Sequence, residues 1–327
     1  MAPLVAHPPS SAVAEPIPTG VATPDGRLYL VASPDGIDAV DSATGATAWS
    51  TGAAAIPILA LPDTLLAIRG ADAGDGAWAG PGTLVAIELA APHAARTGAP
   101  FELPLARHRL LDVRIAGGAL LAGWHARGEP RGFTAAPSPL TGGLRVDLAT
   151  GGASVLDRDQ VPEAARAAIA GQTLWSPAGR GSALWFADGG WSAVLLTPAD
   201  GGRAPTLHHW APDGRATATR LVEPADVDRA SVEDVDAHRL YLRVCEPEAP
   251  RCELRVLDAA TGALLAAIAD PAPSAPRLEP PFAYIPPTLV ATRSAPGQRA
   301  LVAFDVALAH ERWRRPMLPR PLPVRRP

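Results

Sequence analysis

The stretch "AVDSATGATAW" (residues 39–49) predicts two β-strands joined by one tight turn. The Asp41 carboxylate can accept hydrogen bonds from backbone N–H groups two and three residues further along. Gly45 can adopt the positive φ that closes such a turn. Trp49 offers a large flat side chain that can be buried between neighbouring sheets. The stretch is therefore expected to be a structural turn within a larger sheet.

The same pattern recurs along the chain, and this repetition predicts the architecture. Six copies span residues 39–49, 86–96, 145–155, 208–218, 256–266 and 303–313. Their third residues are Asp41, Glu88, Asp147, Trp210, Asp258 and Asp305. Two further short strands precede each copy, so each unit supplies four antiparallel strands. Such units repeated around an axis are typical of an all-β propeller, for which we count six blades while seven or eight stay open.

The propeller is expected to form a single domain over residues 16–317. Residues 1–15 would be an N-terminal extension, and residues 318–327 a tail rich in proline and arginine. Pro162 and Glu163 suit the start of a helix and Gly171 suits its end, so one short inserted helix is expected near 162–170.

The pattern A-x-D-x-x-T-G-x-x-x-W, complete at residues 39–49, resembles the tryptophan-docking repeat of the pyrroloquinoline-quinone-like (quinoprotein-type) β-propeller superfamily. The fifth copy keeps the aspartate, threonine and glycine of the turn but has Ala266 in place of tryptophan. The sixth keeps Asp305 and Trp313 but lacks the Thr-Gly pair. The resemblance implies that aspartate and glycine shape the turns while tryptophan lies between blades. The structural residues that it selects are Asp41, Gly45, Trp49, Asp258, Gly262, Asp305 and Trp313.

The quinone-dependent dehydrogenases of that superfamily carry an adjacent cysteine pair and a calcium ion held partly by asparagine. This chain has no asparagine, and its two cysteines are not adjacent. The resemblance therefore implies a non-catalytic member with no cofactor, no metal and no catalytic residue. The alternative is a small-molecule hydrolase or lyase whose site lies at the mouth of the central channel. Separately, Glu233, Asp234 and Asp236 near His238 could form an acid–base cluster, although a solvated strand end is the commoner explanation.

The long connections of the chain fall on one face of the expected propeller. The first-to-second and third-to-fourth strand connections of a blade share one face, here called the turn face, and they are short. The other connections share the opposite face, here called the loop face, and include residues 70–82, 126–142, 158–172, 197–205 and 270–282. Elaborated loops on a rigid scaffold predict a binding surface, although loops can also merely tolerate insertion.

The loop face is expected to bind a protein or an extended peptide. Aromatic and arginine side chains dominate the energetics of such interfaces. The candidate residues on this face are Trp78, Trp124, His125, Arg127, Arg131, Phe133 and Arg251. The net charge of −4 gives no clustered basic footprint for nucleic acid. No apolar run approaches the roughly 20 residues of a transmembrane helix.

Cys245 and Cys252 flank a short polar loop between two strand-like segments, so a disulfide between them is expected. A disulfide indicates a periplasmic or extracellular location, and without it a cytoplasmic one is expected. No signal peptide is visible at the start of the chain. The ligand, the pathway and the oligomeric state cannot be read from these patterns.

Overall fold

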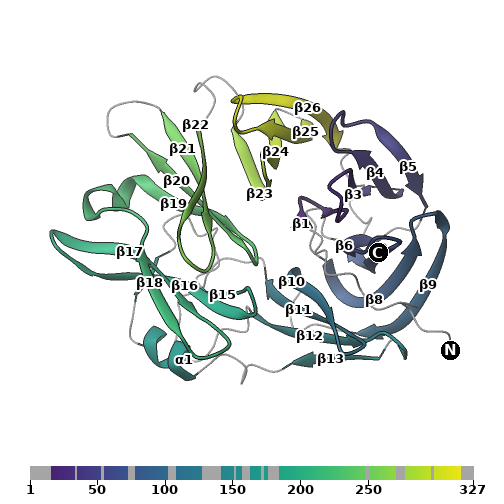
Figure 1. Ribbon diagram of the computed structural model, residues 1–327, viewed down its shortest axis with the longest axis horizontal. Coiled ribbons are helices and arrows are strands. Elements are labelled where there is room, and N and C mark those ends of the chain that lie inside the picture. The colour runs from purple at the N-terminus through teal and green to yellow at the C-terminus, as the bar shows by residue number, and fades with distance from the viewer. Residues whose placement is uncertain are drawn as a thin grey trace, which may run out of the picture.

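Six antiparallel blades surround a central axis in the computed structural model (Figure 1). The structure describes residues 16–33, 35–52, 55–72, 78–101, 108–126, 141–150, 152–156, 163–170, 173–175, 184–246, 251–269, 277–295 and 298–317. The predicted all-β propeller with six blades is confirmed. The expected extension at 1–15 and tail at 318–327 lie outside the described residues.

The strands follow one another outward from the axis within each blade. Blade 1 contains β2 (Gly20–Ala22), β3 (Leu28–Ser33), β4 (Gly36–Asp41) and β5 (Thr47–Thr51), and β1 (Pro16–Ile17) pairs with the inner edge of β2. Blade 2 contains β6 (Ile56–Ala60), β7 (Thr64–Asp72), β8 (Trp78–Glu88) and β9 (Ala91–Phe101). Blade 3 contains β10 (His108–Ala116), β11 (Ala119–Ala126), β12 (Thr141–Asp147) and β13 (Ala153–Leu156).

The second half of the chain forms the other three blades. Blade 4 contains β15 (Leu184–Ala187), β16 (Gly190–Ala199), β17 (Gly202–Trp210) and β18 (Ala216–Arg220), and β14 (Thr173–Leu174) also pairs with β16. Blade 5 contains β19 (Ala230–Val235), β20 (Arg239–Cys245), β21 (Cys252–Asp258) and β22 (Leu264–Ala269). Blade 6 contains β23 (Leu278–Ile285), β24 (Thr288–Ala295), β25 (Gln298–Asp305) and β26 (His310–Met317).

Each of the six sequence copies spans the turn between the third and fourth strands of one blade. The third residue of every copy is the last residue of its third strand, from Asp41 in β4 to Asp305 in β25. In five blades the first residue of the copy lies opposite the eleventh, as Ala39 lies opposite Trp49. In blade 3 the register is displaced by one residue. The sequence period is therefore also the structural period.

The aspartate of the repeat shapes its own turn. Asp41 Oδ1 accepts hydrogen bonds from the backbone N–H of Ala43 (3.1 Å) and Thr44 (2.8 Å) and from the Thr44 hydroxyl (2.7 Å). The bond from the Thr44 hydroxyl, together with those from the backbone, lowers the pKa of Asp41. Asp147 and Asp258 repeat all three bonds in their own turns. These carboxylates are engaged in local structure, as the Asx-turn pattern predicted.

The hydrophobic core lies between the blades. One cluster joins blades 1, 2 and 3, and separate clusters fill the seams between blades 4 and 5, blades 5 and 6, and blades 6 and 1. Its largest fully buried side chains include Trp185, Tyr241 and Phe282. Blade-to-blade burial of this kind holds the ring together, because each sheet covers one face of the next.

Among the described strands, none is exchanged between the first and last blades of the ring. Blade 1 comes wholly from the start of the described chain and blade 6 wholly from its end. Figure 1 shows β26 of blade 6 beside β4 and β5 of blade 1. Trp313 Nε1 donates a hydrogen bond to the Ser42 carbonyl (2.9 Å), and Arg315 pairs with Asp38 and donates to Thr47 (2.6 Å). Side chains of the outermost strand therefore help to close the circle.

The predicted helix is confirmed as α1 (Glu163–Ile169), which buries Ala165 and Ile169 against blade 4. A second short helix, η2 (Pro224–Arg229), was not predicted, although its proline at the first helical turn was a readable signal. No helix within the described ranges is long and apolar enough to cross a membrane.

Two expected loops are largely strand. Within 70–82, β7 continues to Asp72 and β8 begins at Trp78. Within 197–205, β16 continues to Ala199 and β17 begins at Gly202, so the connection is a tight turn in which Gly201 has a φ of 87°. The physical reason is that two strands that extend side by side hydrogen-bond to each other through their backbones. In an irregular loop the same backbone groups would have to hydrogen-bond to water.

Candidate functional site

The residues predicted for the loop face fall into three groups. Arg127, Arg131 and Phe133 lie outside the described residues. Trp78 begins β8, and Trp124 and His125 lie near the end of β11, where the backbone placement is described. Arg251 precedes β21 in blade 5 and is exposed.

The start of β10 brings the second group together. Trp78 lies opposite His108, on one side of β10, and this pair joins the sheets of blades 2 and 3. On the other side of β10, Trp124 lies opposite Leu110 and His125 lies opposite Arg109. Directly opposite residues in antiparallel strands have Cβ atoms about 5 Å apart. We call Trp78, His108, Arg109, Trp124 and His125 the β10 site.

Two members of the β10 site were missed from the sequence. His108 and Arg109 belong to the run "ARHRLL" (106–111), in which basic and imidazole side chains alternate before an apolar strand. The run could have been noticed in the sequence, but the sequence does not show what lies beside it. The register shows that His108 lies opposite Trp78 and that Leu110 lies opposite Trp124. Because successive residues of a strand alternate between its faces, Trp78, His108 and Trp124 occupy positions on one face of the sheet, and Arg109 and His125 occupy positions on the other. Aromatic residues on neighbouring strands are typical of the centre of a binding surface.

Arg251 lies on the loop face two blades away from the β10 site. Cys245 lies directly opposite Cys252, and the predicted disulfide between them is confirmed. The backbone N–H of Glu246 donates to the Arg251 carbonyl (2.9 Å), which closes the hairpin beyond the disulfide. Arg251 is therefore presented by a hairpin that is cross-linked at its base.

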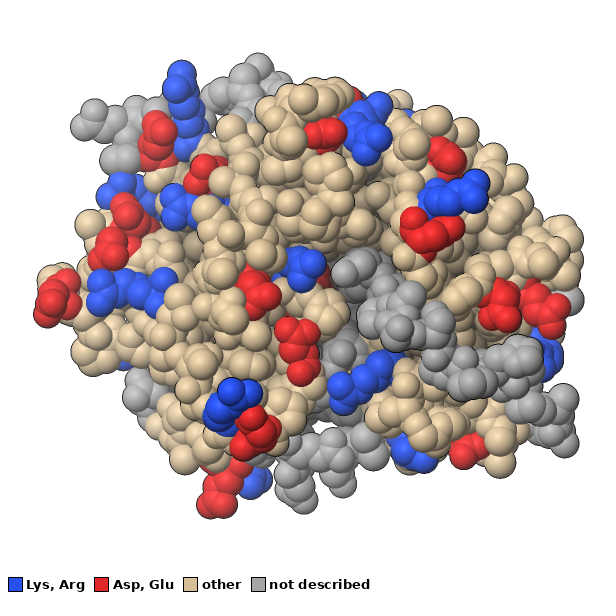
Figure 2. Space-filling view, viewed as in Figure 1, with Lys and Arg blue, Asp and Glu red and all other residues tan. Residues whose placement is uncertain are grey.

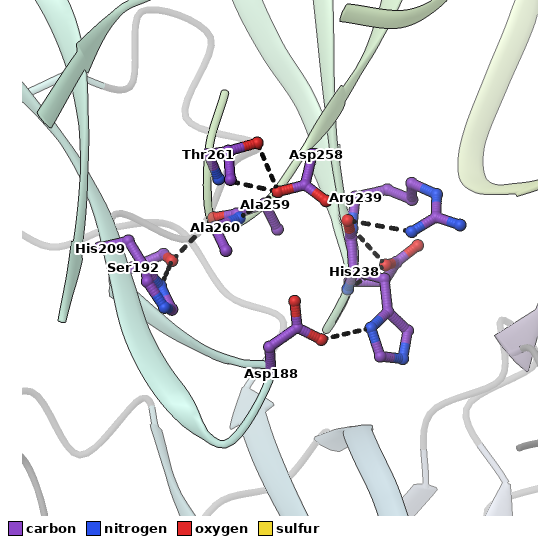
Figure 3. A network of polar contacts seen from close by, with 10 residues as sticks. Asp188, Ser192, His209, His238, Arg239, Asp258, Ala259, Ala260 and Thr261 are labelled. Atoms are coloured by element: carbon purple, nitrogen blue, oxygen red, sulfur yellow. Dashed lines mark hydrogen bonds and ion pairs between the residues drawn. The ribbon is translucent and has the colours of Figure 1, made fainter. Parts of the chain in front are cut away.

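A polar network on the turn face joins blades 4 and 5 (Figure 3). Asp188 lies in the turn between β15 and β16, and His238 lies in the equivalent turn between β19 and β20. His238 Nδ1 is 2.6 Å from Asp188 Oδ1, and both side chains are partly exposed. Burial raises the pKa of Asp188, but the hydrogen bond and charge of His238 outweigh it, so the net pKa is lowered.

Ser192 and His209 form a second contact in the same network. Ser192 Oγ donates to the Ala259 carbonyl of blade 5 (2.9 Å) and lies 2.9 Å from His209 Nδ1. Because the hydroxyl proton is directed at the carbonyl, His209 Nδ1 is the donor to Ser192. Burial lowers the pKa of His209 and keeps its ring neutral. Ser192 is fully buried, so this pair ties two blades together and does not present a nucleophile.

Asp234 in β19 and Asp236 in the turn that follows it are buried, so the interpretation of this segment as a solvated strand end is wrong for these two residues. Asp234 and Asp236 are 6% and 3% exposed. Asp234 Oδ2 accepts the backbone N–H of Phe282 in blade 6 (2.9 Å). Asp236 accepts two backbone N–H groups of its own turn (2.8 and 2.7 Å) and the Tyr241 hydroxyl (3.1 Å). These carboxylates can be buried because N–H and O–H donors from blades 5 and 6 replace the water molecules that would otherwise hydrogen-bond to them.

The described residues contain no group of three or more His, Cys, Asp or Glu side chains that could hold a metal ion. Figure 2 shows the acidic and basic side chains of the described residues interspersed over the viewed face, with no broad area of one sign among them. An arrangement of this kind provides no stripe of positive charge for a nucleic acid backbone on that face.

The geometry defines the chain as a six-bladed β-propeller protein. No family model matches its sequence, and no curated protein does. Similar solved structures include TolB from Acinetobacter baumannii, with 12% identity and a TM-score of 0.37 over 93% of this chain and 63% of TolB. The chain thus spans less than two thirds of TolB.

Two further solved structures are similar at the same low level. The dihydro-heme d1 dehydrogenase NirN in complex with DHE has 15% identity and a TM-score of 0.27 over 96% of this chain and 68% of NirN. Apo AztD from Citrobacter koseri has 13% identity and a TM-score of 0.31 over 94% of this chain and 97% of AztD. Identities this low assign neither a ligand nor an activity to this chain.

Proposed function

We propose that this chain is a non-enzymatic scaffold that binds a protein or an extended peptide through its loop face. The observation that carries the proposal is the register of β10, which sets Trp78 and Trp124 on either side of this strand, on one face of the sheet, at one end of two neighbouring blades. Tryptophan, histidine and arginine combine large contact area with hydrogen-bonding groups, as the anchors of a protein interface do.

The turn face is a poorer candidate for the binding surface than the loop face, because many of its polar groups are already hydrogen-bonded within the chain. Its aspartates accept hydrogen bonds from their own turns, and Ser192 and Thr219 donate to carbonyls of the neighbouring blade. Polar groups that are already paired gain little from a partner, because binding would have to replace bonds that exist. The loop face is therefore the better candidate for recognition.

Affinity capture from the native host, with chemical crosslinking and mass spectrometry, tests the proposal. We expect crosslinks from the partner to lie in blades 2 and 3 on the loop face. Trp78→Ala and Trp124→Ala should each weaken binding by about tenfold or more, as for interface anchors. Arg215→Ala, at an exposed position of the turn face, serves as the control and should bind normally. Crosslinks confined to the turn face would contradict the proposal.

A hydrolase or lyase at the channel mouth remains the second candidate, favoured by one observation. Asp188 and His238 form a carboxylate–imidazole pair between the first turns of neighbouring blades, and such a pair can act in general acid–base catalysis. The test is turnover of a panel of ester, phosphoester and uronide substrates by the unmodified chain and by Asp188→Asn. Turnover that Asp188→Asn abolishes would favour the enzyme over the scaffold.

We also propose that the chain is a non-catalytic member of the quinoprotein-like repeat superfamily and is periplasmic or extracellular. The Asp-Thr turns of blades 1, 3 and 5, together with Trp313 against the turn of blade 1, support the first proposal. The disulfide supports the second, because such bonds persist in oxidising compartments. Cell fractionation followed by intact mass before and after reduction tests the location.

A further inference from the structure

The outer edge of blade 5 lacks the charged residues that usually protect an exposed strand. β22 pairs with β21 on one side, and no strand among the described residues pairs with its other edge. Its sequence, LLAAIA, contains neither a charge nor a proline. In contrast, β26 reads HERWRRPM, β9 contains arginine and two prolines, and β18 is polar and ends in Arg220. Charges and prolines on edge strands prevent pairing with other chains. The outer strands β5 (TAWST) and β13 (ASVL) also lack both, but β22 combines this lack with two exposed leucines.

The same edge exposes apolar side chains. The large hydrophobic residues exposed within the described part of the chain are Leu264 (59%), Leu265 (40%) and Leu308 (69%). The first two begin β22, and Leu308 lies in the turn between β25 and β26 of blade 6. In blades 1 and 5, the turn between the third and fourth strands contacts the outer strand of the preceding blade. The Thr261 carbonyl in the turn of blade 5 accepts a hydrogen bond from Thr219 of β18, and the Ser42 carbonyl in the turn of blade 1 accepts one from Trp313 of β26. By analogy with those seams, we expect Leu308 to lie next to β22.

We propose that β22 is the interface through which two copies of this chain pair edge to edge around a twofold axis. Antiparallel pairing centred on Ala266 would set Leu264 opposite Ile268 and Leu265 opposite Ala267. Apolar residues then meet apolar residues, and the unpaired backbone groups of both edges gain partners. An isologous interface brings each residue near its own symmetry mate, so a charged edge repels itself. The neutral edge of β22 avoids this repulsion, whereas β26 would bring arginines of both copies together.

Sedimentation velocity over a range of chain concentrations tests the interface. We expect a reversible dimer for the unmodified chain. Leu265→Lys places like charges across the axis and should raise the dimer dissociation constant by about tenfold or more. Ala216→Lys adds the same charge to the exposed start of outer strand β18 and should dimerise as the unmodified chain does. Circular dichroism of both variants verifies that they fold.

Hydrogen exchange supplies an independent measurement that needs no variant. Amides of residues 264–269 should exchange more slowly as the chain concentration rises, while those of β18 should not change. An unmodified chain that stays monomeric throughout the range, or a dimer that Leu265→Lys leaves intact, would overturn the proposal. Binding of a different protein at the loop face bears only on the scaffold function, so the two proposals fail separately.

Discussion

The indole ring of Trp313 lies directly over Gly45. A Cβ atom added at Gly45 would stand 2.8 Å from Trp313 Cδ2, closer than real Cβ contacts approach. Trp313 belongs to the last blade and Gly45 to the first, so their contact lies at the point where the ring closes. The glycine therefore serves both the turn, where its φ is 74°, and the seam.

Replacing Gly45 with alanine should destabilise the propeller. The left-handed backbone costs a non-glycine residue about 1–2 kcal/mol, and overpacking against the indole adds about 1–3 kcal/mol. Urea unfolding monitored by tryptophan fluorescence gives the change in the free energy of unfolding. Gly26→Ala is the matched control, because Gly26 has a φ of 69° and no atom within 4 Å of an added Cβ. Equal losses in the two variants would show that the Trp313 contact contributes nothing.

Ala309→Gly should stabilise the protein by about 1 kcal/mol, the cost of a left-handed residue. Ala309 has a φ of 52° and occupies the position that Gly45 and Gly262 hold in their own turns. Thermal unfolding of Ala309→Gly should therefore show a higher midpoint. Ala307→Gly, in the same turn but without a positive φ, is the control and should lower the midpoint, because glycine only adds flexibility there.

Ser192→Ala should cost about 1–3 kcal/mol of stability, because it leaves the Ala259 carbonyl and the His209 ring without a partner in a buried site. Urea unfolding measures the loss. Thr217→Ala removes a similar hydroxyl-to-carbonyl bond at the same seam, but at an exposed position that water can reach. Its cost should be about 0.5 kcal/mol or less. A Ser192→Ala variant as stable as Thr217→Ala would disprove the buried tie between the blades.

Asp188→Asn should flatten the acid side of the stability profile. The pKa of Asp188 in the folded chain is lowered from 3.8, so the unfolded chain takes up the proton first as the pH falls. The stability due to this group is present above pH 3.8 and is lost as the pH falls through the folded pKa. Urea midpoints measured from pH 5 downward should fall more steeply for the unmodified chain than for the variant. Parallel curves would mean that His238 does not hold the carboxylate in its charged form.

The repeat could be read from the sequence because its chemistry is local. Asp41 and Thr44 bond to each other across three residues, and Gly45 adopts its φ within the same turn. Interactions this short leave a pattern that recurs wherever the turn recurs, which is why the blades could be counted. The Cys245–Cys252 disulfide was readable for the same reason, since its loop is short.

The candidate site was only partly predictable, since it depends on contacts between distant parts of the chain. Trp78 and Trp124 were singled out as separate loop-face residues, and the register of β10 is what places them on either side of His108 and Leu110. Asp234 shows the opposite case, because nothing near it in sequence reveals that Phe282 in the next blade donates to it and allows its burial.

The sequence by itself determined the turns, the propeller repeat with six countable copies, and the disulfide, because each follows from bonds within a few residues. The structure fixed the number of blades at six. Only the tertiary structure decided which residues meet between blades: Trp313 with Gly45, His238 with Asp188, and the tryptophans on either side of β10. Those contacts depend on how the sheets stack around the axis, and stacking is set by the shape and burial of whole faces rather than by any short motif.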